Sequence, residues 1–210
     1  MLDRIVVGTA NWAQEYNGHK VSEKEQQLIM EYMKEVGIEW LDVAEAYGTE
    51  YVGKGEFSRV VKMDYGPVRP IPYDSDRDIV ITHSNAYFIG SGHAGYSVDS
   101  VTQIPLSMAG QLPRYIEFPY SILNKNKGIM MLGGFVSLIA RSIFCKGKAL
   151  KYFTPQECID FVLMNPRIDK VIIGVDSVDQ LKENVSHLVK MERFTHTEEV
   201  DTRKFERKDL

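Results

Sequence analysis

Leu41-Asp42-Val43-Ala44-Glu45-Ala46-Tyr47-Gly48 decides the fold, because it marks the point where a short buried strand, Trp40 to Val43, runs out into a loop. An unpaired carboxylate is costly to bury, so Asp42 requires a cationic partner from another strand. Tyr47 lies just past the strand, where its hydroxyl could face a ligand, and Gly48 lets the chain turn away. The alternative is that Asp42 only caps the turn and Tyr47 is an ordinary half-buried aromatic residue.

The residues before this stretch predict a strand and a helix. Residues 4–9 (RIVVGT) form a continuous apolar run, as in a sheet buried on both faces. Ser22 and Glu25 form a capping box, apolar residues follow at helical spacing, and Gly37 ends the helix. Strand, helix and strand at this spacing predict a βαβ unit with a parallel pair and a right-handed crossover.

Six more strands are predicted downstream, at residues 59–63, 78–82, 93–98, 115–120, 135–141 and 170–174. Further helices are predicted at residues 100–112, 124–132, 155–165 and 177–190. The fold class is therefore α/β, a (β/α)8 TIM-type barrel. The connections after the second, third and fourth strands are too poor in helical pattern for full helices, so several crossover helices are expected to be shortened or missing.

Composition limits the other possibilities. With 44% hydrophobic and 26% charged residues, the chain reads as a soluble globular protein. We expect residues 1–192 to form one barrel domain and residues 193–210 a charged, flexible tail. A net charge of -4 argues against a nucleic-acid partner. The longest apolar stretch, Gly128 to Ala140, is shorter than the ~20 residues of a membrane span. Without a visible secretory signal, and with two cysteines, the protein is expected to be cytoplasmic.

The pattern Asp-x-Ala-x-x-Tyr-Gly after a strand, at residues 42–48, resembles the aldo-keto reductases. Three later stretches match in the family's order: residues 60–63 (VVKM), 79–83 (IVITH) and 172–184, which begins IIG and ends EN. The resemblance runs from about residue 4 to residue 190. It implies a barrel that reduces an aldehyde or ketone with NADPH or NADH. The family normally carries helices at the connections that are poor here.

Four side chains at adjacent strand ends are the candidate catalytic residues: Asp42, Tyr47, Lys62 and His83. On a barrel such positions converge on one mouth. Lys62, paired with Asp42, is expected to lower the pKa of Tyr47, which would protonate a carbonyl oxygen oriented by His83. Taken alone, Lys62 is better interpreted as a solvated lysine at a strand end, and His83 as a hydrogen-bonded histidine of the core. Together the four form the family's tetrad, and clustered titratable groups favour a site.

The cofactor residues are implied by the resemblance. Ser97 resembles the serine that holds the nicotinamide carboxamide, and Glu117 stands where a glutamine is usual. Arg141 replaces a stacking aromatic residue, or else forms a surface ion pair. The segment 174–184 resembles the phosphate- and adenosine-binding segment, with the last helix's N-terminus facing the pyrophosphate, or is a plain loop. The full candidate set is Thr9, Ser97, Glu117, Arg141, Ser142, Gly174, Ser177, Gln180 and Asn184.

Other site types lack support. No Gly-x-Gly-x-x-Gly fingerprint is present, so a Rossmann domain is not indicated. His83 and His93 have no third metal ligand at a sensible spacing.

Asp176 and Gln180 stand where a cation would meet the NADPH 2′-phosphate, which predicts a weak or reversed NADPH preference.

Two hypotheses of function remain. The first is an NAD(P)H-dependent oxidoreductase that acts on a small carbonyl substrate. The alternative is a catalytically idle barrel that binds a nucleotide or a partner. The poorly covered flank predicts an exposed apolar patch, and with it a homodimer or a marginally stable monomer. The patch would consist of Val60, Val61, Ile79, Val80 and Ile81.

Overall fold

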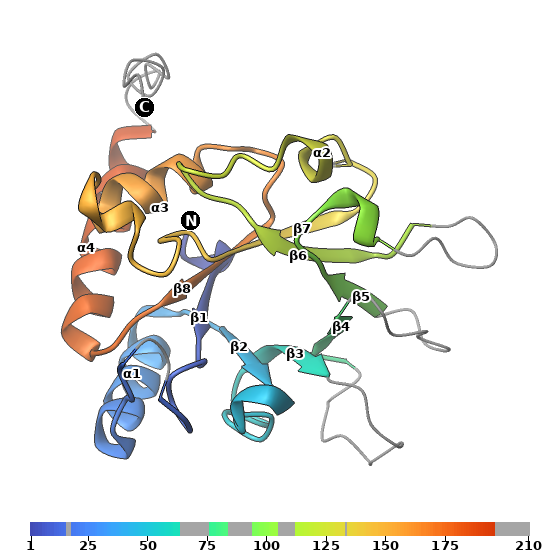
Figure 1. The fold of residues 1–210 in the computed structure, drawn as a ribbon. Helices are drawn as coiled ribbons and strands as arrows, with labels where there is room; N and C mark the ends of the chain where they lie inside the picture. Colours follow the sequence, from blue (N-terminus) through green and yellow to red (C-terminus); the bar gives the residue numbers. More distant parts are fainter. Residues whose placement is uncertain (16–17, 64–75, 84–93, 105–111, 133, 196–210) are drawn as a thin grey trace.

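The computed structural model describes residues 1–15, 18–63, 76–83, 94–104, 112–132 and 134–195. Eight parallel strands form a closed barrel in sequence order, and β8 pairs with β1 to complete it (Figure 1). This confirms the predicted barrel. The strands are β1 (Ile5–Gly8), β2 (Trp40–Ala44), β3 (Ser58–Met63), β4 (Ile79–His83), β5 (Ala94–Ser97), β6 (Tyr115–Pro119), β7 (Ser137–Arg141) and β8 (Lys170–Gly174).

Side chains alternate between the inside and the outside of the barrel along each strand. One apolar cluster comes from inward-facing positions, and it fills the part of the lumen away from the carboxyl ends of the strands. A second, larger cluster joins the outward-facing positions to the helices. The members of the inner cluster are Val6, Val60, Ile79, Ile81, Ile139 and Ile172.

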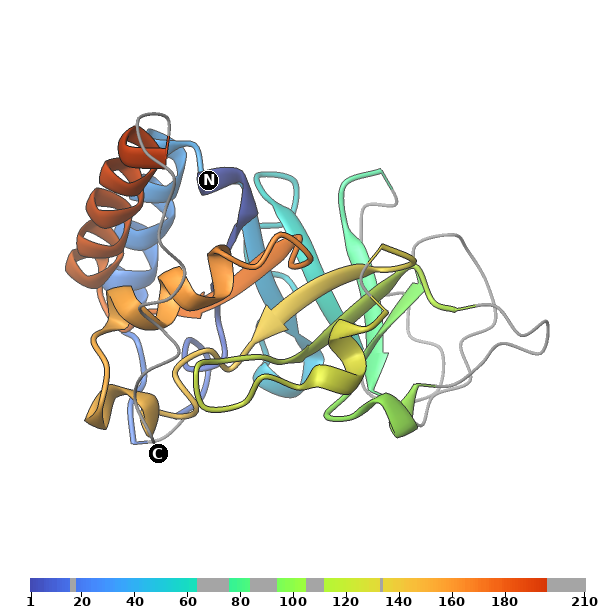
Figure 2. The same ribbon diagram turned by 90° about the horizontal axis from the view of Figure 1, so that it is seen from above.

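The longer helices gather on one side of the barrel, as Figures 1 and 2 show. They are α1 (Glu23–Val36), α3 (Pro155–Leu163) and α4 (Val178–Thr195), and α4 packs against the other two. Two helix starts are fixed by the predicted N-cap side chains. Ser22 accepts from the Glu25 amide, but the predicted capping box is only half formed, since the Glu25 carboxylate accepts the Val178 amide instead. Thr154 forms a full capping box with Glu157. Gly37, at φ 79°, ends α1 in the left-handed conformation.

The opposite side is sparsely covered. In the described part of the chain, no helix longer than a turn lies beside β3, β4 or β5 (Figure 1). The connection after β2 holds only turns and η2 (Glu45–Tyr47), as predicted, whereas residues 64–75 and 84–93 lie outside the described residues. The remaining short helices are η1 (Leu2–Arg4), η3 (Val101–Gln103), α2 (Lys127–Met130) and η4 (Ala149–Lys151).

Three helix predictions need adjustment. Of the helix expected at 100–112, only η3 is described, and residues 105–111 fall outside the described ranges. The helix expected at 124–132 is reduced to the four residues of α2, because Asn126 just before it takes a left-handed conformation at φ 35°. The last helix, α4, continues to residue 195, beyond the point where the tail was expected to begin. Residues 196–210 lie outside the description.

The expectation of an exposed apolar patch on the β3–β4 flank is wrong. Its five residues, Val60, Val61, Ile79, Val80 and Ile81, are each at most 5% exposed. Three of them face the barrel interior, and Val61 belongs to the outer core cluster. The predicted dimer therefore has no support from these residues and stays a prediction.

A buried ion pair lies on the outer face of this flank. Arg59 of β3 and Asp78, just before β4, have side chains 0% and 1% exposed. The guanidinium donates to both Asp78 oxygens, and Nη1 also donates to the Glu50 carbonyl at 2.9 Å. The Asp78 carboxylate accepts the Arg59 backbone amide as well, at 3.1 Å. The pair therefore ties the β2–β3 connection to the starts of β3 and β4.

Candidate functional site

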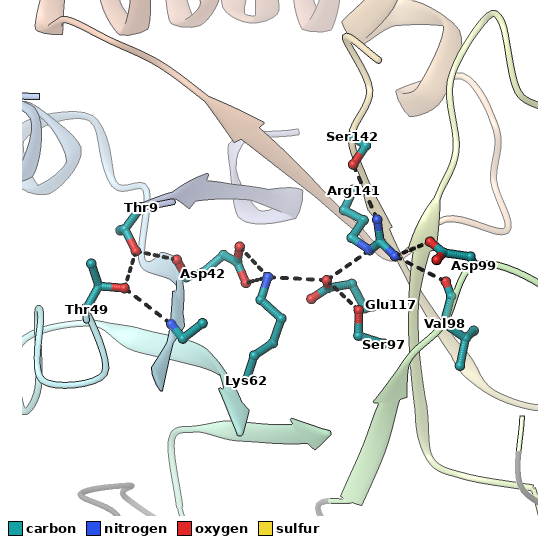
Figure 3. A network of polar contacts seen from close by, with 11 residues as sticks. Thr9, Asp42, Thr49, Lys62, Ser97, Val98, Asp99, Glu117, Arg141 and Ser142 are labelled. Carbon is teal, nitrogen blue, oxygen red and sulfur yellow. Dashed lines mark hydrogen bonds and ion pairs between the residues drawn. The ribbon is translucent and has the colours of Figure 1, made fainter. Parts of the chain in front are cut away.

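Charged side chains line the carboxyl ends of four strands, where the barrel opens (Figure 3). Asp42 of β2, Lys62 of β3, Glu117 of β6 and Arg141 of β7 occupy inward-facing register positions. Barrel active sites lie at this mouth, because all eight strands end there. The four are therefore the natural starting point for a site.

Asp42 and Lys62 form a buried ion pair between neighbouring strands. The Lys62 ammonium lies 2.7 Å from Asp42 Oδ1 and 2.8 Å from Oδ2. Both side chains are nearly inaccessible, at 4% and 3% exposed. This confirms the predicted pairing of Asp42 with a cation from another strand.

Glu117 shares the same ammonium from across the mouth. Its Oε1 lies 3.3 Å from Lys62 Nζ and also accepts the Ser97 hydroxyl at 3.1 Å. The side chain is fully buried, and Oε2 has no hydrogen-bond partner among the described residues. One lysine thus serves two carboxylates, a contact that the sequence did not reveal.

Arg141 extends the network to the far side of the mouth. Its Nε lies 3.3 Å from Glu117 Oε1, and Nη2 lies 2.6 Å from the exposed carboxylate of Asp99. Figure 3 shows the resulting row of alternating charges. The ion-pair interpretation thus describes Arg141, whereas stacking on nicotinamide is untested. Sequence reasoning missed Asp99, although an acidic residue two positions past a barrel strand is a usable signal.

Thr9 braces the backbone beneath this network. The Thr9 and Thr49 hydroxyls lie 2.8 Å apart, and Thr9 Oγ1 is 2.8 Å from the Asp42 carbonyl oxygen. Thr49 Oγ1 in turn accepts the Ala44 amide at 3.3 Å. Thr9 therefore fixes the strand that carries Asp42, and its predicted contact with a cofactor stays a prediction.

Tyr47 lies in η2, immediately after β2, and Gly48 follows it in the left-handed conformation at φ 70°. The Lys62 ammonium lies 5.0 Å from the centroid of the Tyr47 ring. Burial raises the pKa of Tyr47; Asp42 and Glu117 add to the rise, while Lys62 opposes it. The expected fall in this pKa is therefore wrong in net direction. Lys62 acts in the predicted sense, but burial and two carboxylates outweigh it.

The protonation of the cluster follows from its charges. Burial alone would lower the pKa of Lys62, but the carboxylates of Asp42 and Glu117 raise it, so the ammonium stays charged. Burial raises the pKa of Asp42 to about 7, against the attraction of Lys62. The two carboxylates together carry more charge than the single Lys62 ammonium balances.

His83 ends β4 directly opposite Ser97 in the sheet register. Its side chain lies outside the described residues, so its predicted role stays a prediction. The structure brings together the other three members of the tetrad, Asp42, Tyr47 and Lys62.

The loop after β8 is held by hydrogen bonds of its own side chains and of Asn11. Asp176 Oδ1 accepts from Asn11 Nδ2 at 2.5 Å, and the Asp176 amide donates to Gln180 Oε1 at 2.8 Å. Ser177 Oγ accepts the Gln180 amide at 3.3 Å. A carboxylate, rather than a cation, therefore stands beside this loop.

The start of α4 already has an acidic partner. The Val178 amide donates to Glu25 Oε1 of α1 at 2.5 Å. A pyrophosphate at this helix end would have to displace or approach that carboxylate, which is unfavourable for like charges. Of the other candidates, Gly174 ends β8, Asn184 is only 5% exposed, and Ser142 takes a left-handed conformation at φ 56°.

The fold and the mouth together define a class: a closed (β/α)8 barrel with a buried cluster of alternating charges at the strand ends. In the residues that the structure describes, no group of three or more His, Cys, Asp or Glu side chains could hold a metal. No helix in the described ranges is long and apolar enough to span a membrane.

Solved structures share this fold. A proposed aldo-keto reductase from Pseudomonas aeruginosa superposes with a TM-score of 0.64 at 12% sequence identity, over 89% of each chain. A proposed 2,5-diketo-D-gluconic acid reductase B superposes with a TM-score of 0.60 at 13% identity, over 88% of this chain and 81% of the other. No family model and no curated protein matches the sequence. The likeness confirms, at the level of the fold, the resemblance found in the sequence.

Proposed function

We propose that the chain is an aldo-keto reductase-type oxidoreductase that reduces an aldehyde or ketone with NADH or NADPH. The observation that carries the proposal is the position of the Lys62 ammonium, ion-paired with Asp42 and 5.0 Å from the Tyr47 ring centroid. A charged lysine between a buried carboxylate and a phenol is an arrangement suited to holding and donating a proton.

The residues at the mouth divide the chemistry between them. The reduced nicotinamide supplies a hydride to the carbonyl carbon when it is bound. Tyr47 donates its phenolic proton to the carbonyl oxygen, and the product is an alcohol. Lys62 stabilises the phenolate that remains, and Asp42 keeps Lys62 in place. His83 is proposed to orient the carbonyl oxygen by a hydrogen bond.

The residues present fit the nicotinamide end of the cofactor. Glu117 presents a buried carboxylate oxygen without a partner among the described residues, and such an atom calls for an N–H donor. Ser97, bonded to the other oxygen of Glu117, would contribute to the same binding position. The pyrophosphate end fits less well, because Glu25 already occupies the Val178 amide.

The raised pKa of Tyr47 sets a direction with pH. A phenol whose pKa lies above the ordinary value of about 10 stays protonated throughout the neutral range. Carbonyl reduction needs this protonated form, so ionisation of Tyr47 should lower its rate only in strongly alkaline solution. Alcohol oxidation needs the phenolate and should rise with pH. Initial rates in both directions across a pH series measure this.

The experiment that tests the function is a titration of the purified protein with NADH and with NADPH, followed by a screen of carbonyl substrates. Saturable nucleotide binding with turnover of an aldehyde or ketone is the expected result. Binding without turnover would favour the idle barrel instead.

Nucleotide preference provides a separate prediction. Because Asp176 presents a carboxylate near the expected 2′-position, NADH should bind at least as tightly as NADPH. Asp176→Arg should tighten NADPH binding by about tenfold, through charge-assisted hydrogen bonds to the phosphate. Dissociation constants for both nucleotides measure the change. Asp179→Arg is the matched control, since Asp179 is an 89% exposed carboxylate on α4. A wild type that strongly prefers NADPH would contradict the assignment of this loop.

A further inference from the structure

The second carboxylate on Lys62 has no task in the proton transfer proposed above. Asp42 alone holds both of its oxygens within 2.8 Å of the ammonium. Glu117 nevertheless reaches the same ammonium at 3.3 Å from the opposite side of the mouth. It does so as a fully buried side chain with one oxygen lacking a partner among the described residues, an arrangement that is costly in itself.

The charges around this site do not cancel. When Asp42, Glu117 and Lys62 are all ionised, the three carry a net charge of -1. Arg141 is the nearest further cation, but its Nη2 lies closer to Asp99, at 2.6 Å, than its Nε lies to Glu117, at 3.3 Å. The excess negative charge therefore stays at the centre of the mouth.

Several charged and polar groups of the described residues face this centre. Asp42 comes from β2, Lys62 from β3, Glu117 from β6 and Arg141 from β7, with Ser97 from β5 bonded to Glu117. The Tyr47 ring lies over Lys62 from η2, Asp99 follows β5, and β4 ends at His83 opposite Ser97. Lys62 and Arg141 are thus the cations that offset the carboxylates here, among the described residues.

We infer that Glu117 is a positioning residue: because it shares the Lys62 ammonium with Asp42, it reduces the stabilisation that this cation gives to the Tyr47 phenolate. The inference rests on the proposed function, in which Tyr47 transfers its proton. An ammonium shared between two carboxylates stabilises a nearby phenolate less than one paired with a single carboxylate. In agreement, Glu117 is among the groups that raise the pKa of Tyr47, after burial and Asp42.

The consequence concerns the pH range in which each direction of the reaction can run. A strongly held proton keeps Tyr47 an acid, the form used in carbonyl reduction, and depletes the phenolate used in alcohol oxidation. The glutamine found at this position in the resembled family would bring no charge. The carboxylate at residue 117 is therefore expected to keep carbonyl reduction running to higher pH than a glutamine would.

The test compares the ionisation of Tyr47 in the wild type and in Glu117→Gln. Phenolate formation is monitored by ultraviolet difference spectroscopy during a pH titration. Comparison with a Tyr47→Phe background isolates the Tyr47 component from the other tyrosines of the chain. The expected result is a titration midpoint lower by roughly one pH unit in Glu117→Gln than in the wild type. An unchanged or raised midpoint would overturn the inference. The wild type alone is informative too: a Tyr47 midpoint below the ordinary value of about 10 would also overturn it.

Asp99→Asn is the matched control. It also removes one carboxylate from the network, but Asp99 contacts Arg141 rather than Lys62. The Tyr47 midpoint should therefore stay at its wild-type value. Equal shifts in Asp99→Asn and Glu117→Gln would show a general charge effect and overturn the positioning role.

Activity measurements separate this inference from the proposed function. If carbonyl reduction occurs, its alkaline limb should move to lower pH in Glu117→Gln, by the same amount as the titration. If the titration shifts as expected but neither protein reduces carbonyls, the positioning role stands and the proposed function fails. If both proteins reduce carbonyls but the titration does not move, the positioning role fails and the function stands.

Discussion

Tyr47→Phe is expected to reduce kcat for carbonyl reduction by roughly 10²–10⁴-fold and to leave nucleotide binding nearly unchanged. The loss is that of one general acid, because phenylalanine keeps the ring and removes only the proton donor. The ring packs over Lys62, and this contact survives the substitution. Steady-state kinetics with a carbonyl substrate, together with nucleotide dissociation constants, measure the two effects separately.

Tyr51→Phe provides the matched control. Tyr51 lies in the same connection after β2, but its side chain is 63% exposed and it takes no part in the charged network. The same loss of one hydroxyl should leave kcat at the wild-type level there. Near-normal turnover in Tyr47→Phe would contradict the proposed mechanism, and an equal loss in both variants would point to a general effect of the connection.

The barrel strands were predictable because buried parallel strands leave a simple trace in the sequence. Lys170 is followed by a short apolar run and then a turn, which predicts a strand over residues 170–174, and β8 has these bounds. Helix α3 was equally clear, since Thr154 and Pro155 mark its start. The helix expected at 124–132 failed because the left-handed conformation of Asn126 is set by the surrounding structure. Asn126 Nδ2 donates to the Asp99 carbonyl at 3.1 Å, and a contact between residues so far apart cannot be read from the local sequence pattern.

Some contacts of the candidate site could likewise be predicted from the sequence, and others could not. The Asp42–Lys62 pair could be expected, because a buried carboxylate requires a cation and Lys62 lies near the end of the adjacent strand. The Lys62–Glu117 contact joins residues 55 positions apart across the lumen, so it depends on the closure of the barrel. The sign of the Tyr47 pKa shift was missed for the same reason. It depends on burial and on Glu117, and both arise only once the strands are assembled.

The largest expected effect on stability comes from the buried pair of Arg59 and Asp78. Asp78→Asn should lower the free energy of unfolding by about 3–5 kcal/mol, as expected when one partner of a buried ion pair is removed. The guanidinium would lose the carboxylate that accepts from both Nε and Nη2. Denaturant unfolding, followed by far-ultraviolet circular dichroism, measures the change.

Glu56→Gln is the matched control for this prediction, because it also converts one carboxylate of an ion pair to an amide. Glu56 pairs with Lys34 at the surface, where the two side chains are 59% and 53% exposed. Solvent screens such a pair, so its loss should cost at most about 1 kcal/mol. A larger loss in Glu56→Gln than in Asp78→Asn would contradict the assignment of the Arg59–Asp78 pair as a main stabilising element of this flank. Replacing both partners, in Arg59→Met with Asp78→Leu, should recover much of the lost stability, because no buried charge then remains at these two positions. That recovery would show that stability at these two positions requires packed side chains without an unpaired buried charge, and does not require the ion pair itself.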